Sequence, residues 1–281
     1  MVQPSAEAGL VGQVGTRDGH DIVVVGASAG GVEALMQLAY GLPPDLAASV
    51  FVVLHIAPDS ASALPEILSR AGRLPAVHPA DGQRIEPVRI YVAPPDRHLL
   101  LVGPRIHVVR GPRENGHRPA VDPLFRTAAR SFGPRVVGVI LSGTLDDGTA
   151  GLAAIKMRGG VAIVQDPDEA LFQGMPRSAI DNVAVDHVLP VNEIAPRIAQ
   201  LVQEPVTGSA PAVTDEMDME ARMAELEEAA VQRNERPGTP SVFSCPECGG
   251  VLWEVADGES HFEIMQKHLV NPIPPRRYRR S

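Results

Sequence analysis

The sequence predicts an α/β protein with a doubly wound, mainly parallel β-sheet, and three observations support this fold class. Uninterrupted apolar runs at residues 22–25, 50–54 and 136–141 are typical of strands that are buried on both faces of a parallel sheet. Each run is followed by a glycine-rich or polar turn and then by apolar residues at helical spacing. The first two runs lie far enough apart for a helical crossover, so we expect their strands to be parallel.

The segment at residues 21–40 is predicted to form a strand, a tight turn and a helix, with Ser28 at the apex of the turn. Glycines at positions 26, 30 and 31 allow a sharp turn and leave little bulk around the serine hydroxyl. This is the nucleophile-elbow pattern G-x-S-x-G. A phosphate-cradling turn of a dinucleotide-binding fold is the alternative, although its fingerprint has glycine where Ser28 stands. The motif alone leaves both interpretations open.

The second strand ends directly before His55, and a short helix is predicted at residues 63–68. Parallel strands bring their carboxyl ends to one edge of the sheet, where open α/β sheets bind ligands. We therefore expect His55 and Ser28 to lie at the same edge.

Between residues 77 and 109 the pattern changes to short strands separated by proline- and glycine-containing turns. This pattern predicts an antiparallel meander at the edge of the sheet, with strands at residues 90–92, 99–102 and 106–109. A polar loop at residues 111–119 and a helix at residues 121–132 follow.

The strand at residues 136–141 is followed by a polar segment that places Asp147 at the same edge of the sheet. A serine nucleophile needs an adjacent base, and the base needs a carboxylate that holds its tautomer. Ser28, His55 and Asp147 could fill these roles, in an order that differs from the Ser, Asp, His order of α/β-hydrolases. Taken singly, Ser28 or Asp147 could cap a helix, His55 could be a buried structural histidine, and Asp146 competes for the acid role.

The remaining elements predicted in this domain are two strands, a loop and a closing helix. The strands fall at residues 160–164 and 185–189, the loop at residues 165–176, and the helix ends near residue 202.

Length and composition indicate one well-packed domain with a small appendage. The chain has 281 residues, a formal net charge of −9 and no apolar run as long as a membrane span. The acidic balance argues against a nucleic-acid partner, and the N-terminal residues lack the features of a secretory signal. Both cysteines lie in one C-P-E-C cluster, which indicates metal or redox chemistry in a reducing compartment. We therefore expect a cytoplasmic protein without membrane insertion.

The chain resembles the catalytic domain of the CheB family of chemotaxis protein-glutamate methylesterases over roughly residues 21–202. Six motifs carry the resemblance, in the family's order. They are G-A-S-A-G-G at residues 26–31, H-I-A-P at 55–58, Y-V-A-P-P-D-R-H at 91–98, H-R-P-A-V-D-P-L-F at 117–125, L-S-G-T-L-D-D-G at 141–148 and G-M-P-R at 174–177.

The resemblance implies a role for each residue of the site. Ser28 is similar in position to the family's nucleophile, His55 to its base and Asp147 to its orienting acid. The backbone N–H groups of Ala29 and Thr144 fall where the family holds the oxyanion. The family usually has threonine and methionine at these two positions, and the backbone role makes the difference unimportant. No cofactor is implied for catalysis.

The resemblance also identifies His117, Arg118 and Met175 as candidates that line the substrate groove. It implies a serine hydrolase that removes methyl groups from glutamate γ-methyl esters, and that can deamidate glutamine, on methyl-accepting chemoreceptor helices. A small-molecule carboxylesterase with the same residues is the alternative, and it would need a deep apolar pocket. Two further hypotheses are a nucleotide-binding module on the glycine-rich turn, and a scaffold for a functional C-terminal region.

The segments outside the domain at residues 21–203 carry weaker signals. Residues 1–20 are predicted to be a disordered lead-in, which leaves no room for the receiver domain that many family members carry. We therefore expect an enzyme that is not autoinhibited in cis, or one controlled by a separate regulator. The expected partners besides the receptor are such a regulator or a cognate methyltransferase. Residues 204–240 are predicted to be a linker that contains an acidic helix at residues 215–233. We interpret this helix as a solvated tether in preference to a helix that docks on a partner.

Residues 241–281 are predicted to be a small tail that resembles a degenerate zinc ribbon. Cys245 and Cys248 form half of a zinc-binding motif, and no second C-x-x-C follows. Either structural zinc or disorder would fit this tail.

Overall fold

The computed structural model describes residues 19–206, 211–213, 239–244, 251–257 and 260–265. Nearly all of the predicted lead-in, the whole acidic helix at residues 215–233 and the cysteine pair Cys245 and Cys248 lie outside the described residues. None of the helices within the described ranges is both long enough and apolar enough to cross a membrane.

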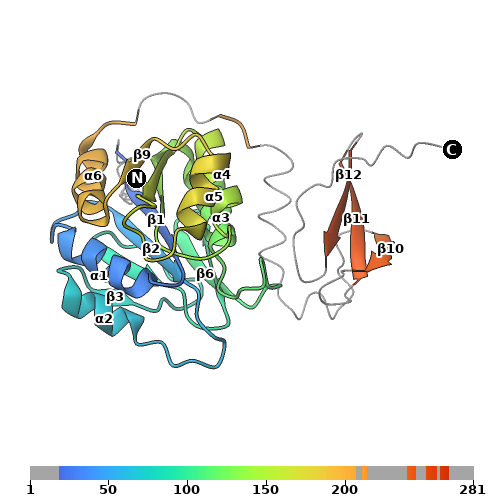
Figure 1. The fold of residues 1–281 in the computed structure, drawn as a ribbon, viewed down its shortest axis with the longest axis horizontal. Coiled ribbons are helices and arrows are strands. Elements are labelled where there is room, and N and C mark those ends of the chain that lie inside the picture. Colours follow the sequence, from blue (N-terminus) through green and yellow to red (C-terminus); the bar gives the residue numbers. More distant parts are fainter. Residues whose placement is uncertain (1–18, 207–210, 214–238, 245–250, 258–259, 266–281) are drawn as a thin grey trace, which may run out of the picture.

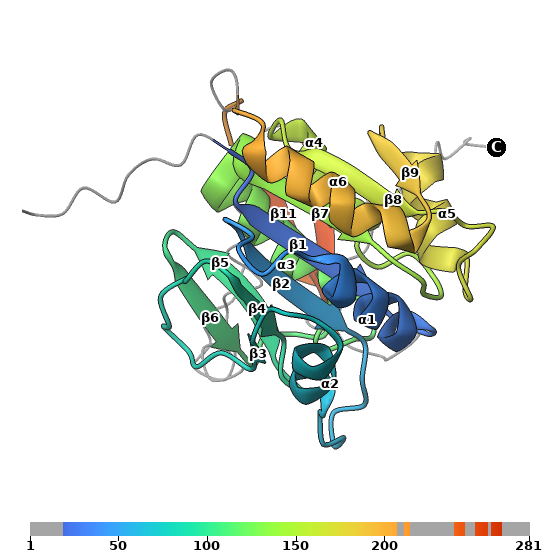
Figure 2. The same cartoon turned by 90° about the vertical axis from the view of Figure 1, so that its left-hand side faces the viewer.

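Seven parallel strands form the central sheet, in the order β3–β4–β2–β1–β7–β8–β9 (Figure 2). Every neighbouring pair is parallel, which confirms the mainly parallel sheet expected from the apolar runs. The strands are β1 (Ile22–Ala27), β2 (Ser49–Leu54), β3 (Ala76–Val77), β4 (Arg89–Val92), β7 (Val136–Ile140), β8 (Val161–Gln165) and β9 (His187–Leu189).

Helices cover both faces of this sheet, so the fold is doubly wound (Figure 1). On one face, α1 (Gly31–Gly41), α2 (Leu64–Ala71) and α6 (Val191–Gln203) pack over one apolar cluster. On the other face, α3 (Val121–Phe132), α4 (Thr149–Met157) and α5 (Gly174–Asn182) pack over a second cluster. A short 3-10 helix, η1 (Gly133–Arg135), leads from α3 into β7. Strands β1, β2 and β7 are buried along their whole length as a result.

The antiparallel segment that follows β4 is a two-stranded hairpin, and this corrects one detail of the sequence prediction. Strands β5 (His98–Val102) and β6 (Arg105–Val109) pair antiparallel in a separate two-stranded sheet. The strand at residues 90–92 was expected in the same meander, but as β4 it joins the parallel sheet between β3 and β2. After β4 the chain passes through two prolines and Asp96, whose φ of 55° is left-handed, and this turn separates β4 from the hairpin.

Two other elements differ from the sequence prediction. Strand β3 was not predicted, because two residues are too few to show a pattern. Helix α5 begins inside the segment that was predicted to be a loop. A loop was predicted because the first turn of α5 contains a glycine and a proline, which are typical of loops.

The C-terminal region contains a three-stranded antiparallel sheet. Its strands are β10 (Thr239–Ser244), β11 (Val251–Asp257) and β12 (Ser260–Met265), with β11 in the middle.

The order of the strands changes direction between β1 and β7. The chain runs from β1 to β2 on one side of this point, and from β7 to β8 on the other. Open α/β sheets bind ligands at such a switch point, beyond the carboxyl ends of the strands. Ser28 and the segment at residues 142–148 both follow the carboxyl ends of these two strands.

Candidate active site

The turn after β1 holds Ser28 at the edge of the sheet. The Ser28 N–H donates to the carbonyl oxygen of Ser142 at 3.0 Å, which joins the ends of β1 and β7. Gly30 is the N-cap of α1, with a left-handed φ of 70°, so Ser28 is not the residue that caps this helix. A Cβ atom on Gly30 would lie 2.8 Å from the Ser142 hydroxyl oxygen and 2.9 Å from the Leu171 Cβ. Glycine is therefore required here by both conformation and space.

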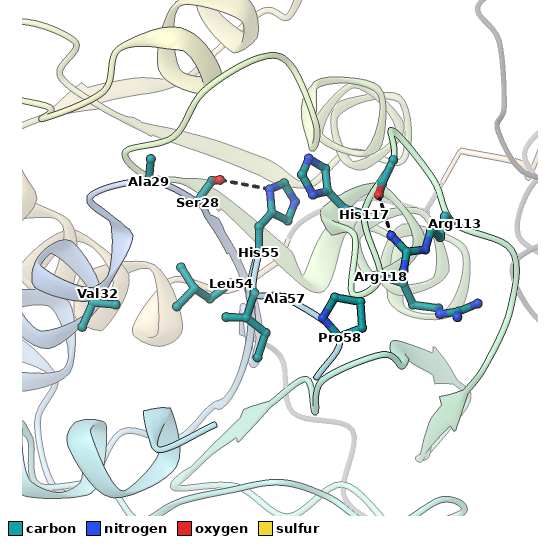
Figure 3. Close-up of a pocket in the computed structure, with 12 residues that line it drawn as sticks. Ser28, Ala29, Val32, Leu54, His55, Ala57, Pro58, Arg113, His117 and Arg118 are labelled. Atoms are coloured by element: carbon teal, nitrogen blue, oxygen red, sulfur yellow. Dashed lines mark hydrogen bonds between the residues drawn. The ribbon is translucent and has the colours of Figure 1, made fainter. Parts of the chain in front are cut away.

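His55 lies next to Ser28 because β1 and β2 are paired in register. Ala27 is opposite Leu54, and the His55 N–H donates to the carbonyl oxygen of Ala27 at 3.1 Å. The side chains that follow these strands meet, with 3.1 Å between the Ser28 Oγ and the His55 Nδ1 (Figure 3).

Asp147 contacts the other nitrogen of the same imidazole. Its Oδ2 lies 2.6 Å from the His55 Nε2. A carboxylate only accepts hydrogen bonds, so the Nε2 carries the proton and the Nδ1 presents a lone pair to the Ser28 hydroxyl. The structure thus brings together the three residues that the sequence placed at one edge of the sheet. Asp146, the competing acid, is exposed.

The Asp147 carboxylate is buried and is held by donors from three directions. Its Oδ2 also accepts the Val121 N–H at 2.7 Å, and its Oδ1 accepts the Asp122 N–H at 3.2 Å, both in the first turn of α3. The Asn115 Nδ2 donates to Oδ1 at 3.0 Å. Burial by itself would raise the Asp147 pKa, but the His55 interaction and these donors outweigh it and lower the pKa to about 2. Asp147 is therefore an anion at neutral pH, suited to stabilise a protonated His55.

A second buried carboxyl group lies beside Asp147. The Asp122 Oδ1 accepts the Gly151 N–H at 2.7 Å, and its Oδ2 accepts the Asn115 Nδ2 at 3.1 Å. Burial and the negative charge of Asp147 raise the Asp122 pKa well above its ordinary value.

His117 covers the open face of His55. The two imidazole rings are stacked, with 3.7 Å between their centroids and 7° between their planes (Figure 3). Burial and the neighbouring His55 lower the pKa of His117, which favours its neutral form. This stacking limits the orientations that the His55 ring can adopt.

Ser28 and His55 open into a pocket of about 570 Å³. Its wall contains apolar side chains from α1 and β2, such as Val32 and Leu54, together with Arg113 and Arg118. The Arg118 guanidinium is already bound, with its Nε and Nη2 at 2.9 and 2.7 Å from the Asp96 Oδ1. Arg118 thus lines the pocket but is held by the protein itself.

The predicted groove residue Met175 does not line this pocket. Its side chain is fully buried, and it packs beneath Gly143 in the loop after β7. A Cβ atom on Gly143 would overlap the Met175 sulfur and would lie 2.9 Å from the Ser28 Cβ. The physical reason for the error is α5, whose first turn places Met175 against the core instead of on the surface.

The loops that carry Ala29 and Thr144 are joined by a buried hydroxyl. The Ser142 Oγ donates to the Ala29 carbonyl at 2.8 Å and accepts the Phe172 N–H at 3.0 Å. Within the part of the chain that the structure describes, no acceptor takes the N–H of Ala29 or Thr144. Neither amide is therefore committed to a bond within the described residues.

Four residues that support this site were not singled out from the sequence. Asn115 and Asp122 contact Asp147, Ser142 joins the two loops, and the Gln165 side-chain oxygen accepts the Ser142 N–H at 2.8 Å. The Asn-Gly pair at residues 115–116 is a turn signal that could have drawn attention to Asn115. Gln165 ends a buried strand and carries no comparable signal.

No group of three or more metal-ligating side chains occurs within the described ranges. Cys245 and Cys248 lie outside those ranges, so zinc binding by the tail stays a prediction.

Comparisons with known proteins point to one family. The family model for the CheB methylesterase matches residues 23–198. A protein-glutamate methylesterase/protein-glutamine glutaminase from Anaeromyxobacter dehalogenans is 39% identical over 183 residues, which cover 65% of this chain and 54% of the relative. A putative protein of the same name from Leptospira interrogans is 36% identical, over 66% of this chain and 96% of the relative.

A solved structure is also similar. The crystal structure of the Thermotoga maritima CheB methylesterase catalytic domain matches with a TM-score of 0.62 and 32% identity, over 65% of this chain and 98% of that chain. The chain spans about half the length of the first curated relatives that it matches. Because the family model covers more than half of the sequence, the chain belongs to the CheB methylesterase family.

Proposed function

We propose that this protein is a serine hydrolase that removes methyl groups from glutamate γ-methyl esters on methyl-accepting chemoreceptor helices. By the same chemistry it would deamidate glutamine on these receptors. The observation that carries the proposal is the hydrogen-bonded series from Ser28 through His55 to Asp147, which opens into a pocket at the switch point of the sheet. The names of the relatives support the same activity.

In the first half of the reaction, the Ser28 Oγ attacks the carbonyl carbon of the γ-methyl ester. The His55 Nδ1 takes the hydroxyl proton, and the ionised Asp147 stabilises the imidazolium that forms. The tetrahedral intermediate collapses when the imidazolium gives its proton to the methoxy oxygen. Methanol leaves, and the glutamyl group stays bound to Ser28 as an ester.

In the second half, a water molecule takes the place of methanol. His55 accepts a proton from the water as it attacks the acyl-enzyme carbonyl, and then returns a proton to the Ser28 oxygen. The products are methanol and a glutamate carboxylic acid, so the net reaction consumes one water for each ester. With glutamine as the substrate, ammonia replaces methanol.

The N–H groups of Ala29 and Thr144 would hold the negative oxygen of both tetrahedral intermediates. Their lack of an acceptor within the described ranges supports this role. Donors that are fixed before the reaction stabilise the developing charge without reorganisation, and one such donor contributes about 3–4 kcal/mol in a serine protease. Ser142 and Gly143 would hold the two donors in place.

His117 and Arg118 remain our candidates for contact with the substrate, because both line the pocket. The names of the relatives favour a protein-glutamate methylesterase over the alternative of a small-molecule carboxylesterase. We further propose a cytoplasmic enzyme without a nucleic-acid partner, which acts together with a separate regulator or a cognate methyltransferase. The net charge of −9 and the closely spaced cysteines support the first two points.

The test is methanol release from a receptor fragment that carries tritiated glutamate methyl esters. The wild-type protein should release methanol, and Ser28→Ala should lower kcat by several powers of ten while the thermal unfolding transition persists. Ser60→Ala, which changes an exposed serine, is the matched control and should retain wild-type activity. Undiminished release by Ser28→Ala would contradict the proposal. Hydrolysis of free glutamate γ-methyl ester in preference to the receptor fragment would favour the small-molecule esterase.

A further inference from the structure

We infer that Asn115 is a positioning residue for the reaction, because its side-chain amide holds the Asp147 carboxylate in place for His55. This inference rests on the proposed function and adds a residue to its machinery. Asn115 is absent from the pocket wall, so it would act through Asp147 and not by contact with the substrate.

Asn115 occupies a tight two-residue turn at the surface, and its amide nitrogen reaches two buried carboxyl groups. The Glu114 N–H donates to the His117 carbonyl at 3.1 Å, and the His117 N–H donates to the Glu114 carbonyl at 2.8 Å. Between them, Asn115 and Gly116 have left-handed φ values of 50° and 77°. This is the hairpin turn that Asn-Gly strongly favours. The same turn places His117 on the face of His55, so one short segment contacts two members of the site.

The Asn115 amide lies between two buried carboxyl groups. Its single nitrogen donates to the Asp147 Oδ1 at 3.0 Å and to the Asp122 Oδ2 at 3.1 Å, which uses both of its hydrogens. The other Asp122 oxygen is fixed by the Gly151 N–H in α4. The amide therefore connects Asp147 to the α3–α4 layer, in which Asp122 is anchored.

Loss of this amide would leave the Asp147 Oδ1 poorly held. Its other donor in the described structure is the Asp122 N–H, at the longer distance of 3.2 Å. The link that the amide makes between the Asp147 and Asp122 carboxyl groups, by donating to both, would be lost as well. If the Asp147 carboxylate rotates, its Oδ2 no longer points at the His55 Nε2. The hydrogen bond between these two atoms is the one that orients the base.

A purely structural role for Asn115 makes a different prediction. Asparagine, aspartate and glycine are all favoured at this position of the turn, because each tolerates a left-handed conformation. If the backbone conformation were the whole reason for Asn115, either replacement would preserve activity. If the amide donor matters, both replacements lose it, and aspartate also adds a third carboxyl group to the site.

The experiment compares the wild type, Asn115→Gly and Asn115→Asp in the tritiated receptor-fragment assay, with kcat and KM measured separately. We expect kcat to fall by about tenfold or more in Asn115→Gly, since one hydrogen bond to a charged group is lost. The fall should be larger in Asn115→Asp, and KM should stay within about twofold of the wild type in both. Similar unfolding transitions in the three proteins would show that the turn is kept.

The outcomes separate this inference from the proposed function. A wild type that releases no methanol overturns the proposed function and this inference with it. An active wild type with unchanged kcat in either variant overturns this inference alone. A raised KM with unchanged kcat also overturns it, because Asn115 would then contribute to substrate binding.

Discussion

His98 is a buried switch whose protonation should weaken the loop that supports the site. Its Nε2 donates to the Pro112 carbonyl at 2.6 Å, and its Nδ1 accepts the Ala120 N–H at 3.3 Å. These two bonds need the neutral imidazole, and they hold both ends of the loop that contains Asn115 and His117. Burial lowers the pKa of His98 from its usual 6.5 to about 4.

The sign and size of the effect follow from this shift. Between pH 6.5 and about 4 the unfolded chain takes up a proton at His98 and the folded chain does not, so stability falls as the pH falls. Above pH 6.5 the contribution is constant. The full loss is about 3 kcal/mol near pH 4, and about 2 kcal/mol of it should occur between pH 7 and pH 5.

The assay is urea unfolding at pH 7 and pH 5 for the wild type and His98→Gln. Other groups also titrate over this range, among them His20, His117 and His187, whose pKa values are also lowered chiefly by burial. The difference between the two proteins isolates His98. The wild type should lose about 2 kcal/mol more than His98→Gln between the two pH values. Equal losses in both proteins would refute the assignment of a neutral, buried His98.

Two further predictions concern the oxyanion loops and the tail. Ser142→Ala removes the hydroxyl that joins the Ala29 carbonyl to the Phe172 N–H, so kcat for methanol release should fall by about tenfold. The control is Ser178→Ala, which removes a hydroxyl bonded to Thr149 and should leave kcat unchanged. We also propose that Cys245 and Cys248 bind zinc. Metal analysis of the full chain should find zinc in the wild type and much less zinc in a double variant that carries Cys245→Ser and Cys248→Ser. A metal-free wild type would contradict the proposal.

The sequence predicts the parts of the site that depend on strand order. Ser28 and His55 directly follow buried apolar runs, and parallel pairing of adjacent strands is enough to bring their side chains together. The sequence also predicts the position of Asp147 at this edge. Asp147 follows the apolar run at residues 136–141, whose strand β7 lies next to β1 at the point where the strand order reverses.

Other parts of the site could not be predicted, because they depend on packing between elements. Asn115 meets Asp147 only because a left-handed turn crosses the start of α3, and local composition does not record that contact. Met175 lies in a segment rich in loop-forming residues, so its position inside a helix was hidden. The pairing of β4 was missed for a similar reason, since a four-residue strand does not encode its neighbour.

Asp147 links the stability of the fold to the chemistry of the site. A buried carboxylate is costly unless donors compensate it, and here the donors are two N–H groups of α3, the Asn115 amide and His55. The first turn of α3 has no side-chain cap of its own, so the Asp147 anion also satisfies amides that would otherwise lack partners. Ser28 has no such second task, because its hydroxyl bonds only to His55 among the described side chains. Ser28 can therefore be replaced with little effect on the fold, whereas Asp147 is part of the framework that holds α3 against the sheet.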